Sequence, residues 1–469
     1  MPDRHMSGTV SGAGEGGAML NRSLSLWQLV LIGMVIVQPT APMGIYGVIS
    51  NTAHGHVVTA ILIAMAAMLF TAVSYGRMAR LYPSAGSAYV YVRQEIHPAL
   101  GFVVGWALLL DYLLNPLVCT AFCAKAMTNI VPGVPYYAWV PAFVGLFTLL
   151  NLRGVQTSAR LSGAMCGVLL LVVVVFLAFV WHRVAGAGHD AAFFWRPFHD
   201  PASFRPDRVL AGASVAVLTY IGFDAVSTLS EEARDPRRAV MRAIMLVCLT
   251  TGLLSGLEVY AAQLVWGSAP FPAGNVESAF AMVAGRLGGV ALFQMINVAL
   301  LVATVGSGLG SQLAAGRLLY SMGRAGALPR RFFGTLDPVH RIPRNNILAV
   351  GAVTVAGAEM MEAFAGRLGG DAFEIGAQAL NFGAFVAFMG VNAAAFAAYA
   401  IRQRRRSPGF VLTPLAGFAI CAFVWAHLNR TALIVGGSWL AWGVVYGGWR
   451  TLAARGRTGL GDMAVPEAE

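Results

Sequence analysis

Two carboxylates lie inside otherwise apolar stretches of the sequence, at Asp111 and Asp224. A buried charge in a membrane-spanning segment is expensive and usually functional. Asp224 closes the run Tyr220-Ile221-Gly222-Phe223-Asp224, in which Gly222 weakens a helix directly beside the carboxylate. The group could accept a hydrogen bond, hold a proton or pair with an ammonium ion. The structural alternative is that it caps backbone N–H groups freed by a helix break.

Asp111 has a phenol beside it, Tyr112. Neighbouring residues of a helix point about 100° apart, so only one of the two can fully face a central cavity. Tyr112 is the better candidate for a substrate or gate contact, and Asp111 for a structural pairing. Asp111, Tyr112, Tyr220, Gly222, Phe223 and Asp224 form one group of candidate substrate-binding residues.

A second group lies in the first long apolar run, at Pro39-Thr40-Ala41-Pro42-Met43-Gly44-Ile45-Tyr46-Gly47. Two prolines and two glycines within nine residues predict an interrupted helix over Pro39–Gly47, because proline removes a backbone donor and clashes with the preceding turn. An interrupted membrane helix indicates a transporter binding site. A structural proline kink is the alternative. The candidate residues here are Pro42, Gly44, Ile45, Tyr46 and Gly47.

The elements that carry these residues follow from composition. Hydrophobic residues make up 57% of the 469 residues and charged residues 11%, with a mean hydropathy of +0.68. Apolar runs recur at the length that crosses a bilayer, about 20 residues. They predict an all-α integral membrane protein of about twelve helices, between a disordered tail at 1–22 and a tail at 451–469. The predicted helices lie near 26–50, 56–81, 98–124, 136–152, 160–182, 208–230, 239–265, 287–321, 346–364, 374–401, 411–428 and 431–448. The eighth is too long for one span and is expected to continue into the cytoplasm.

The net charge of +11 comes almost entirely from arginine. With the N-terminus inside, 24 of the 32 Lys and Arg residues fall on the cytoplasmic side. This bias follows the positive-inside rule and predicts two cytoplasmic termini in an inner membrane. It does not indicate a nucleic-acid partner. The five cysteines form no CxxC and the nine histidines are scattered, so no metal site, cofactor or enzymatic activity is predicted.

The predicted breaks lie in the first and sixth helices. If five helices form a repeat, these are the first helix of each half, which is the layout of inverted-repeat transporters. The short connection near 231–238 speaks against a carrier built as six plus six.

At the cytoplasmic end of the sixth helix, Ser230-Glu231-Glu232-Ala233-Arg234-Asp235-Pro236-Arg237-Arg238 combines acids with arginines. Glu231 and Glu232 could form a gate of ion pairs, or they could be ordinary loop charges. In the eighth helix, Ser307 and Ser311 share a face and are weak candidates for ion coupling.

Four motifs make the sequence recognisable: Tyr-Pro-x-Ala-Gly-Ser-Ala-Tyr at 82–89, Gly-Trp-x-x-x-x-Asp-Tyr-Leu-Leu at 105–114, Gly-Phe-Asp-Ala-Val-Ser-Thr-Leu-Ser-Glu-Glu at 222–232 and Gly-Arg-Leu-Leu-Tyr-x-Met-Gly-Arg at 316–324. Over 23–450 the chain resembles the amino acid–polyamine–organocation permease superfamily, and within it the bacterial putrescine importers. The resemblance implies a LeuT-like five-plus-five inverted repeat, two additional C-terminal helices, and a site among helices one, three, six, eight and ten. It makes Tyr112 an aromatic substrate contact and Glu232 a functional glutamate.

Two departures from the family pattern bear on the substrate and on coupling. Gly44-Ile45-Tyr46-Gly47 is looser than the Gly-x-Gly run that binds an α-carboxylate in amino acid permeases, and Gly44 stands where putrescine importers carry an aspartate. The stretch at 166–170 lacks the lysine that some proton-coupled relatives keep in helix five.

The function expected from the resemblance is secondary active transport of an amino acid or a polyamine such as putrescine. Alternating access across the cytoplasmic membrane and proton coupling are expected with it. Exchange without ion coupling is the alternative. The expected partners are a small amine or amino acid and the lipid bilayer, with the oligomeric state left open.

Overall fold

The structure is a computed structural model that describes residues 20, 22–131, 133–186, 188–272, 275–276, 278–364, 372–405 and 407–453. Helices joined by short connections make up this part of the chain, which also contains one isolated parallel bridge between Leu24 and Ala233. The prediction of an all-α membrane protein is confirmed.

Within the described residues, ten helical segments are long and apolar enough to cross a membrane. They are α3 (Val57–Leu81), α5 (Pro98–Ile130), α7 (Val155–Ala185), Pro206–Glu232, α10 (Pro236–Trp266), α11 (Ala279–Arg324), α13 (Arg344–Phe364), Gln378–Arg402, α15 (Pro408–Ala426) and α16 (Arg430–Ala453). The pair α1 (Leu26–Val37) and α2 (Ala41–Thr52) is together long and apolar enough for a further span but is bent by 44°, and the apolar helix α6 (Tyr136–Leu152) is shorter. Each predicted helix overlaps one of these segments, while the count of twelve crossings and the inverted repeat stay predictions.

The remaining elements lie between these segments or form part of them. They are α4 (Ser87–Glu95), α8 (Ala191–Trp195), α9 (Pro206–Ala216), the 3₁₀ helices η1 (Val217–Tyr220) and η2 (Phe223–Glu232), α12 (Arg330–Phe333), α14 (Ala372–Phe396) and the π-helical turn η4 (Ala397–Arg402).

The first span is interrupted, but over fewer residues than predicted. Helix α1 begins with a capping box between Ser25 and Gln28, and the chain leaves helical geometry at Gln38, whose φ is 71°. Helix α2 then begins at Ala41, so the prediction of a break extending to Gly47 is wrong. Pro42 lies in the first turn of α2, where its missing N–H needs no partner, and so it begins a helix instead of breaking one.

The sixth predicted helix is broken at Gly222, as its sequence indicates. Helix α9 passes into η1, Ile221 is extended, and Gly222 has a φ of 108° that favours glycine. The chain then continues as η2, a 3₁₀ helix of ten residues. Runs of 3₁₀ helix longer than three or four residues are uncommon and often mark a functional hinge.

The eighth predicted helix, α11, is 46 residues long and has non-helical geometry at Gly288 and Gly289. Its irregularity therefore lies near its beginning, where the segment Ala279–Leu287 meets the rest of the helix.

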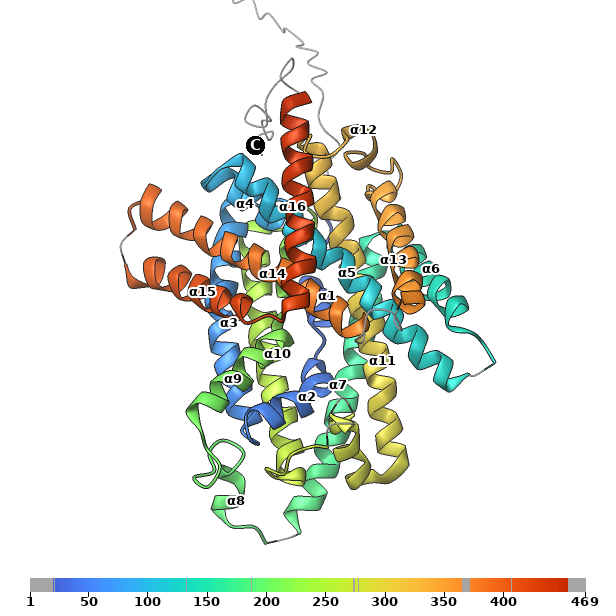
Figure 1. The fold of residues 1–469 in the computed structure, drawn as a ribbon, viewed down its shortest axis with the longest axis vertical. Coiled ribbons are helices and arrows are strands. Elements are labelled where there is room, and N and C mark those ends of the chain that lie inside the picture. The colour runs from blue at the N-terminus through green and yellow to red at the C-terminus, as the bar shows by residue number, and fades with distance from the viewer. Residues whose placement is uncertain are drawn as a thin grey trace, which may run out of the picture.

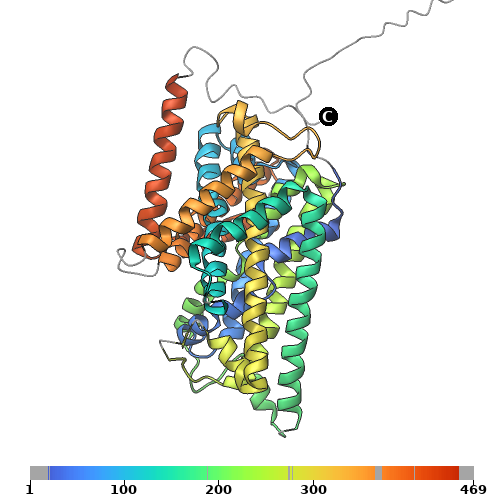
Figure 2. The same ribbon diagram turned by 90° about the vertical axis from the view of Figure 1, so that its right-hand side faces the viewer.

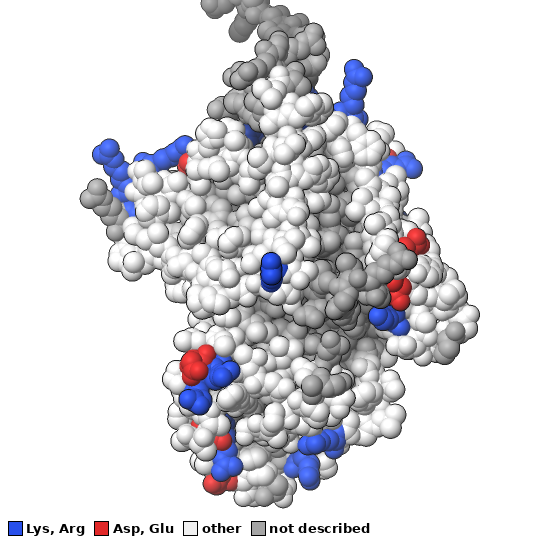
Figure 3. Space-filling model, viewed as in Figure 1, with Lys and Arg blue, Asp and Glu red and all other residues white. Residues whose placement is uncertain are grey.

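Helix α1 lies in the middle of the molecule, packed against α7, α10, α11 and η2 (Figure 1). Helices α7 and α11 run side by side in both views, and α16 stands at one edge of the bundle (Figure 2). On the face shown in Figure 3, charged side chains gather in small groups, and wide surfaces between them carry none. The bundle thus surrounds the break after α1 with other helices.

Candidate substrate and gating site

The two breaks lie against each other. A Cβ atom on Gly222 would lie 3.0 Å from Cγ2 of Ile36, two residues before α1 loses its helical geometry. One turn earlier in α1, a Cβ on Gly33 would lie 2.5 Å from Val226 of η2, closer than real Cβ contacts. Glycine therefore allows the ends of α1 and η2 to meet.

A side chain of helix α11 hydrogen-bonds a backbone carbonyl that the break leaves free at the end of α1. In an unbroken helix the Ile36 carbonyl would accept from residue 40, but the break removes that donor. The Ser307 hydroxyl donates to this carbonyl instead, at 2.8 Å, and lies 3.4 Å from Oδ1 of Asn115. Ser311 lies one turn further along α11 and is also buried. The structure thus places Ser307 at the break as a cap.

Asp224 and Tyr112 meet directly beside this junction. The Tyr112 hydroxyl of α5 donates to Oδ2 of Asp224 at 2.6 Å, and both side chains are buried. Within the described residues Oδ1 of Asp224 accepts no hydrogen bond of good geometry, although the backbone N–H groups of Gly222, Asp224 and Ala225 interact with the carboxylate. Asp111 is buried too, at the close contact of α5 with α14, where a Cβ on Gly383 would lie 3.1 Å from its backbone nitrogen. Two buried acids therefore lie beside one phenol.

Aromatic rings surround the residue before Asp224. The Phe223 ring stacks on Phe388 of α14 with centroids 5.3 Å apart, and meets Tyr75 of α3 edge-on at 5.7 Å. The Tyr75 ring in turn contacts Tyr91 of α4, and its buried hydroxyl has no partner among the described residues. Sequence reasoning missed Tyr75 and Phe388, because an aromatic residue in an apolar run carries no signal of its own.

The candidate residues of α2 lie elsewhere. The Tyr46 ring meets Phe271 and Phe280 edge-on, both at 5.6 Å, and a Cβ on Gly47 would collide with the carbonyl oxygen of Val276. Their partners therefore belong to the segment that leads into α11, and not to the surroundings of Asp224.

The remaining candidates divide between surface and interior. Gly44 is exposed, with open space around a built Cβ, while Ile45 is half-buried and Pro42 is buried. Tyr220 is buried and donates from its hydroxyl to the Ile61 carbonyl of α3 at 3.0 Å.

Glu232 forms a fully buried ion pair at the far end of η2. Its Oε2 lies 2.5 Å from Nη2 of Arg317 and accepts from Nε of the same guanidinium at 2.7 Å. Its backbone carbonyl accepts from the N–H groups of Ser23 and Leu24, at 2.9 Å each. Glu232 thus joins η2 both to α11 and to the segment that precedes α1.

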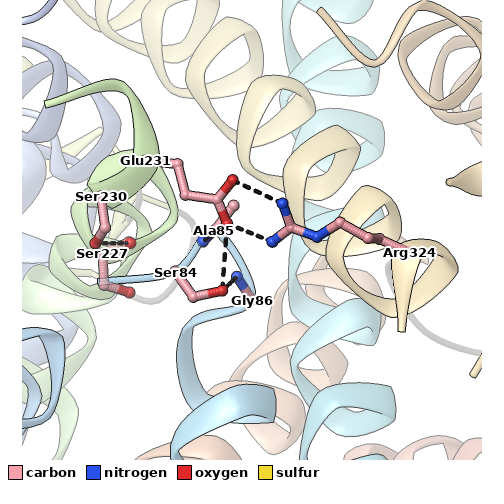
Figure 4. Close-up of polar contacts among 7 residues, drawn as sticks. All are labelled: Ser84, Ala85, Gly86, Ser227, Ser230, Glu231 and Arg324. Carbon is pink, nitrogen blue, oxygen red and sulfur yellow. Dashed lines mark hydrogen bonds and ion pairs between the residues drawn. The ribbon is translucent and has the colours of Figure 1, made fainter. Parts of the chain in front are cut away.

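Glu231 forms a second, partly exposed pair. Both of its carboxylate oxygens accept from Arg324, at 2.6 and 3.1 Å, and Oε1 also accepts from the Ala85 N–H at 3.0 Å and the Ser84 hydroxyl at 3.4 Å (Figure 4). The partners of both carboxylates come from α11 and the α3–α4 connection, and not from the arginines at 234–238. A spacing of seven residues in the 316–324 motif, which places Arg317 and Arg324 on one helix face, was the available signal.

The fold and this arrangement define a multi-pass membrane permease. Residues 28–446 match the family model of amino acid permeases, and the chain belongs to that family. It is therefore a transporter and not an enzyme, and the predicted membership in the superfamily is confirmed.

Individual relatives span nearly the same length. The chain is 32% identical over 439 residues to the low-affinity putrescine importer PlaP of Escherichia coli (strain K12), covering 91% of this chain and 93% of that protein. It is 26% identical over 466 residues to the branched-chain amino acid permease BcaP of Lactococcus lactis, covering 90% and 93%. The vacuolar cationic amino acid transporter 4 of Arabidopsis thaliana is 27% identical over 378 residues, covering 74% and 60%.

Proposed function

We propose that the chain imports a small organic amine, either a polyamine such as putrescine or an amino acid, and that Asp224 binds its ammonium group. The observation that carries the proposal is the buried Asp224 carboxylate at the meeting of two broken segments. One of its oxygens accepts from the Tyr112 hydroxyl; among the described residues the other accepts no hydrogen bond of good geometry, although the backbone N–H groups at the break interact with the carboxylate. A buried carboxylate oxygen without a donor is a favourable position for an N–H group of a substrate.

The aromatic surroundings support a cationic substrate. Ammonium groups are attracted to the faces of aromatic rings, by about 0.5–2 kcal/mol at each favourable contact. Such rings lie beside Asp224: its neighbour Phe223 contacts the rings of Phe388 and Tyr75. The relatives named as a putrescine importer and as a cationic amino acid transporter act on substrates of this charge.

The contacts at the two ends of η2 support a proposal of alternating access. Its first residues contact the end of α1, and its last two residues are held by Arg317 and Arg324. A movement of η2 that breaks these ion pairs would open the site toward the cytoplasm. We place the site in a bacterial inner membrane because of the similarity to the putrescine importer of Escherichia coli. Both chain termini would be cytoplasmic, on the basis of the arginine distribution.

Proton coupling is proposed because two buried acids, Asp111 and Asp224, interact electrostatically, and neither is paired with an arginine or lysine among the described residues. A proton on Asp111 and a cationic substrate at Asp224 would together neutralise both buried acids. Binding of the amine and of the proton would thereby be linked. Exchange of one amine for another without a coupled ion is the second candidate.

Uptake into proteoliposomes tests the proposal. Labelled putrescine and a panel of labelled amino acids would be offered with and without an inward proton gradient, and with sodium in place of potassium. We expect uptake of at least one amine that depends on the proton gradient and not on sodium. Uptake that needs only an amine inside the vesicle would favour exchange, and no uptake of any amine or amino acid would refute the functional assignment.

The Asp224→Asn variant tests the role of the site itself. This substitution keeps the shape and removes the charge, so we expect uptake to fall to background while the protein still elutes as a single species in detergent. Near-normal uptake would reduce Asp224 to a residue that caps the break.

A further inference from the structure

Four arginines line a crevice between the end of α3 and the beginning of α10. They are Arg80 in the last turn of α3, and Arg237, Arg238 and Arg242 in the first turns of α10. The crevice has a volume of about 570 Å³, and all four side chains are exposed. At its base the two helices touch, since a Cβ on Gly76 would lie 2.7 Å from Cγ of Met241.

These guanidinium groups lack anionic partners within the described part of the chain, where none of the four forms an ion pair with a carboxylate. Arg77, one turn before Arg80, differs from them: it donates to the Gly409 carbonyl at 2.7 Å and lies over the Phe410 ring at 4.3 Å. The crevice thus gathers arginines that the protein itself does not neutralise.

The position of the arginines is electrostatically unfavourable without an added anion. Three of them lie at the N-terminal end of α10, where the helix macrodipole already contributes positive potential. Arg238 and Arg242 are also separated by four residues, a spacing at which like charges on a helix repel each other. An anion bound in the crevice would relieve both effects.

The same helix continues from the arginines into an apolar stripe. Leu246, Leu249, Leu253 and Leu257 follow Arg242 at intervals of four, three, four and four residues, which keeps them on one face of α10. Leu249, Leu253 and Leu257 are 39%, 54% and 45% exposed, and Leu246 lines the crevice. A ligand with a negative head and apolar chains matches this order of side chains.

We propose that the crevice binds one anionic phospholipid of the cytoplasmic leaflet, with its phosphodiester among Arg80, Arg237, Arg238 and Arg242 and its acyl chains along the leucines of α10. Basic pockets between membrane helices on the cytoplasmic side are known to hold such headgroups. The leucine stripe favours the lipid over a free phosphate, which would use only the arginines. Because α10 begins four residues after the end of η2, the bound lipid would contact the helix connected to η2, the segment whose movement is part of the proposed function.

Native mass spectrometry of the purified full-length protein in detergent tests this inference. Phosphatidylglycerol would be titrated against phosphatidylcholine of the same chains, and inorganic phosphate would be added as a competitor. We expect phosphatidylglycerol to bind at least about tenfold more tightly than phosphatidylcholine, and phosphate to leave it bound. Equal binding of the two lipids, or displacement by phosphate at millimolar concentration, would overturn the proposal.

The triple variant R237Q/R238Q/R242Q locates the site. We expect it to bind phosphatidylglycerol at least about tenfold more weakly. The matched control R330Q/R331Q/R344Q removes three exposed arginines around α12 and α13, and it should bind like the unmodified protein. Equal losses in both triple variants, or none in the first, would contradict the assignment. If the first variant aggregates, R80Q/R242Q repeats the test with one change in each helix.

Discussion

At the scale of single residues, the hydrogen bond from the Tyr112 hydroxyl to the Asp224 carboxylate is the central contact of the proposed site. A carboxylate in apolar surroundings needs donors, and the phenol supplies one to Oδ2 while leaving Oδ1 for another group. Both residues can be predicted from the sequence, because Asp224 is a carboxylate within an apolar run and Tyr112 lies beside another, Asp111. Their direct contact joins positions 112 residues apart, and nothing in either local pattern predicts it.

The Tyr112→Phe variant should weaken substrate binding without unfolding the protein. A hydrogen bond to a charged group contributes about 1.5–3 kcal/mol, so we expect KM for uptake to rise by about tenfold or more. Initial uptake rates over a range of amine concentrations measure this.

Tyr136→Phe is the matched control for this prediction, since its hydroxyl donates to the Ala358 carbonyl at 3.1 Å on another helix pair. A similar change of KM in both variants would mean that Tyr112 acts only through stability.

At the scale of elements, η2 is held at its last two residues by two ion pairs of different character. Glu232 and Arg317 are 2% and 1% exposed, whereas Glu231 and Arg324 are 14% and 22% exposed. Breaking a buried pair leaves an uncompensated charge, while a partly solvated charge keeps contact with water. The two pairs should therefore differ in stability although they lie on adjacent residues.

Arg317→Gln should lower the free energy of unfolding by about 3–5 kcal/mol, and Arg324→Gln by about 1 kcal/mol or less. Thermal unfolding of the purified proteins in one detergent compares them. The double variant E232Q/R317Q should recover part of the larger loss, because it removes both charges. Equal losses in the two single variants would show that burial does not separate the pairs.

The positions of the helices can be predicted from the sequence, because runs of apolar residues mark them. Gly222 marks the second break. The first break was predicted too wide, since Pro42 begins α2 and Gly44 is accommodated within it. Tyr46 and Gly47 were grouped with the site by sequence proximity alone. In the structure they contact Val276 and the first turn of α11, because α2 is a separate helix directed away by the 44° bend.

At the scale of the whole molecule, the orientation in the membrane is a prediction of the arginine distribution. Ala192 in α8 and Ser407 before α15 are exposed and lie on opposite sides in that orientation. All five native cysteines are buried, so the unmodified chain should react little with a maleimide.

In intact cells, a membrane-impermeant maleimide should label Ala192→Cys and not Ser407→Cys. Permeabilised cells should allow labelling of both variants, which controls for accessibility. Labelling of Ser407→Cys alone in intact cells would reverse the orientation, and with it the cytoplasmic position of the arginine crevice.

The 3₁₀ geometry of η2 has a consequence for its length. Ten residues of 3₁₀ helix extend about 20 Å, whereas ten residues of α-helix extend about 15 Å. Rewinding η2 to an α-helix would shorten it by about 5 Å, close to one helical turn, and would draw Glu231 and Glu232 back from Arg324 and Arg317. Such a contraction would couple Asp224 at one end of η2 to the two ion pairs at its other end, without a separate hinge.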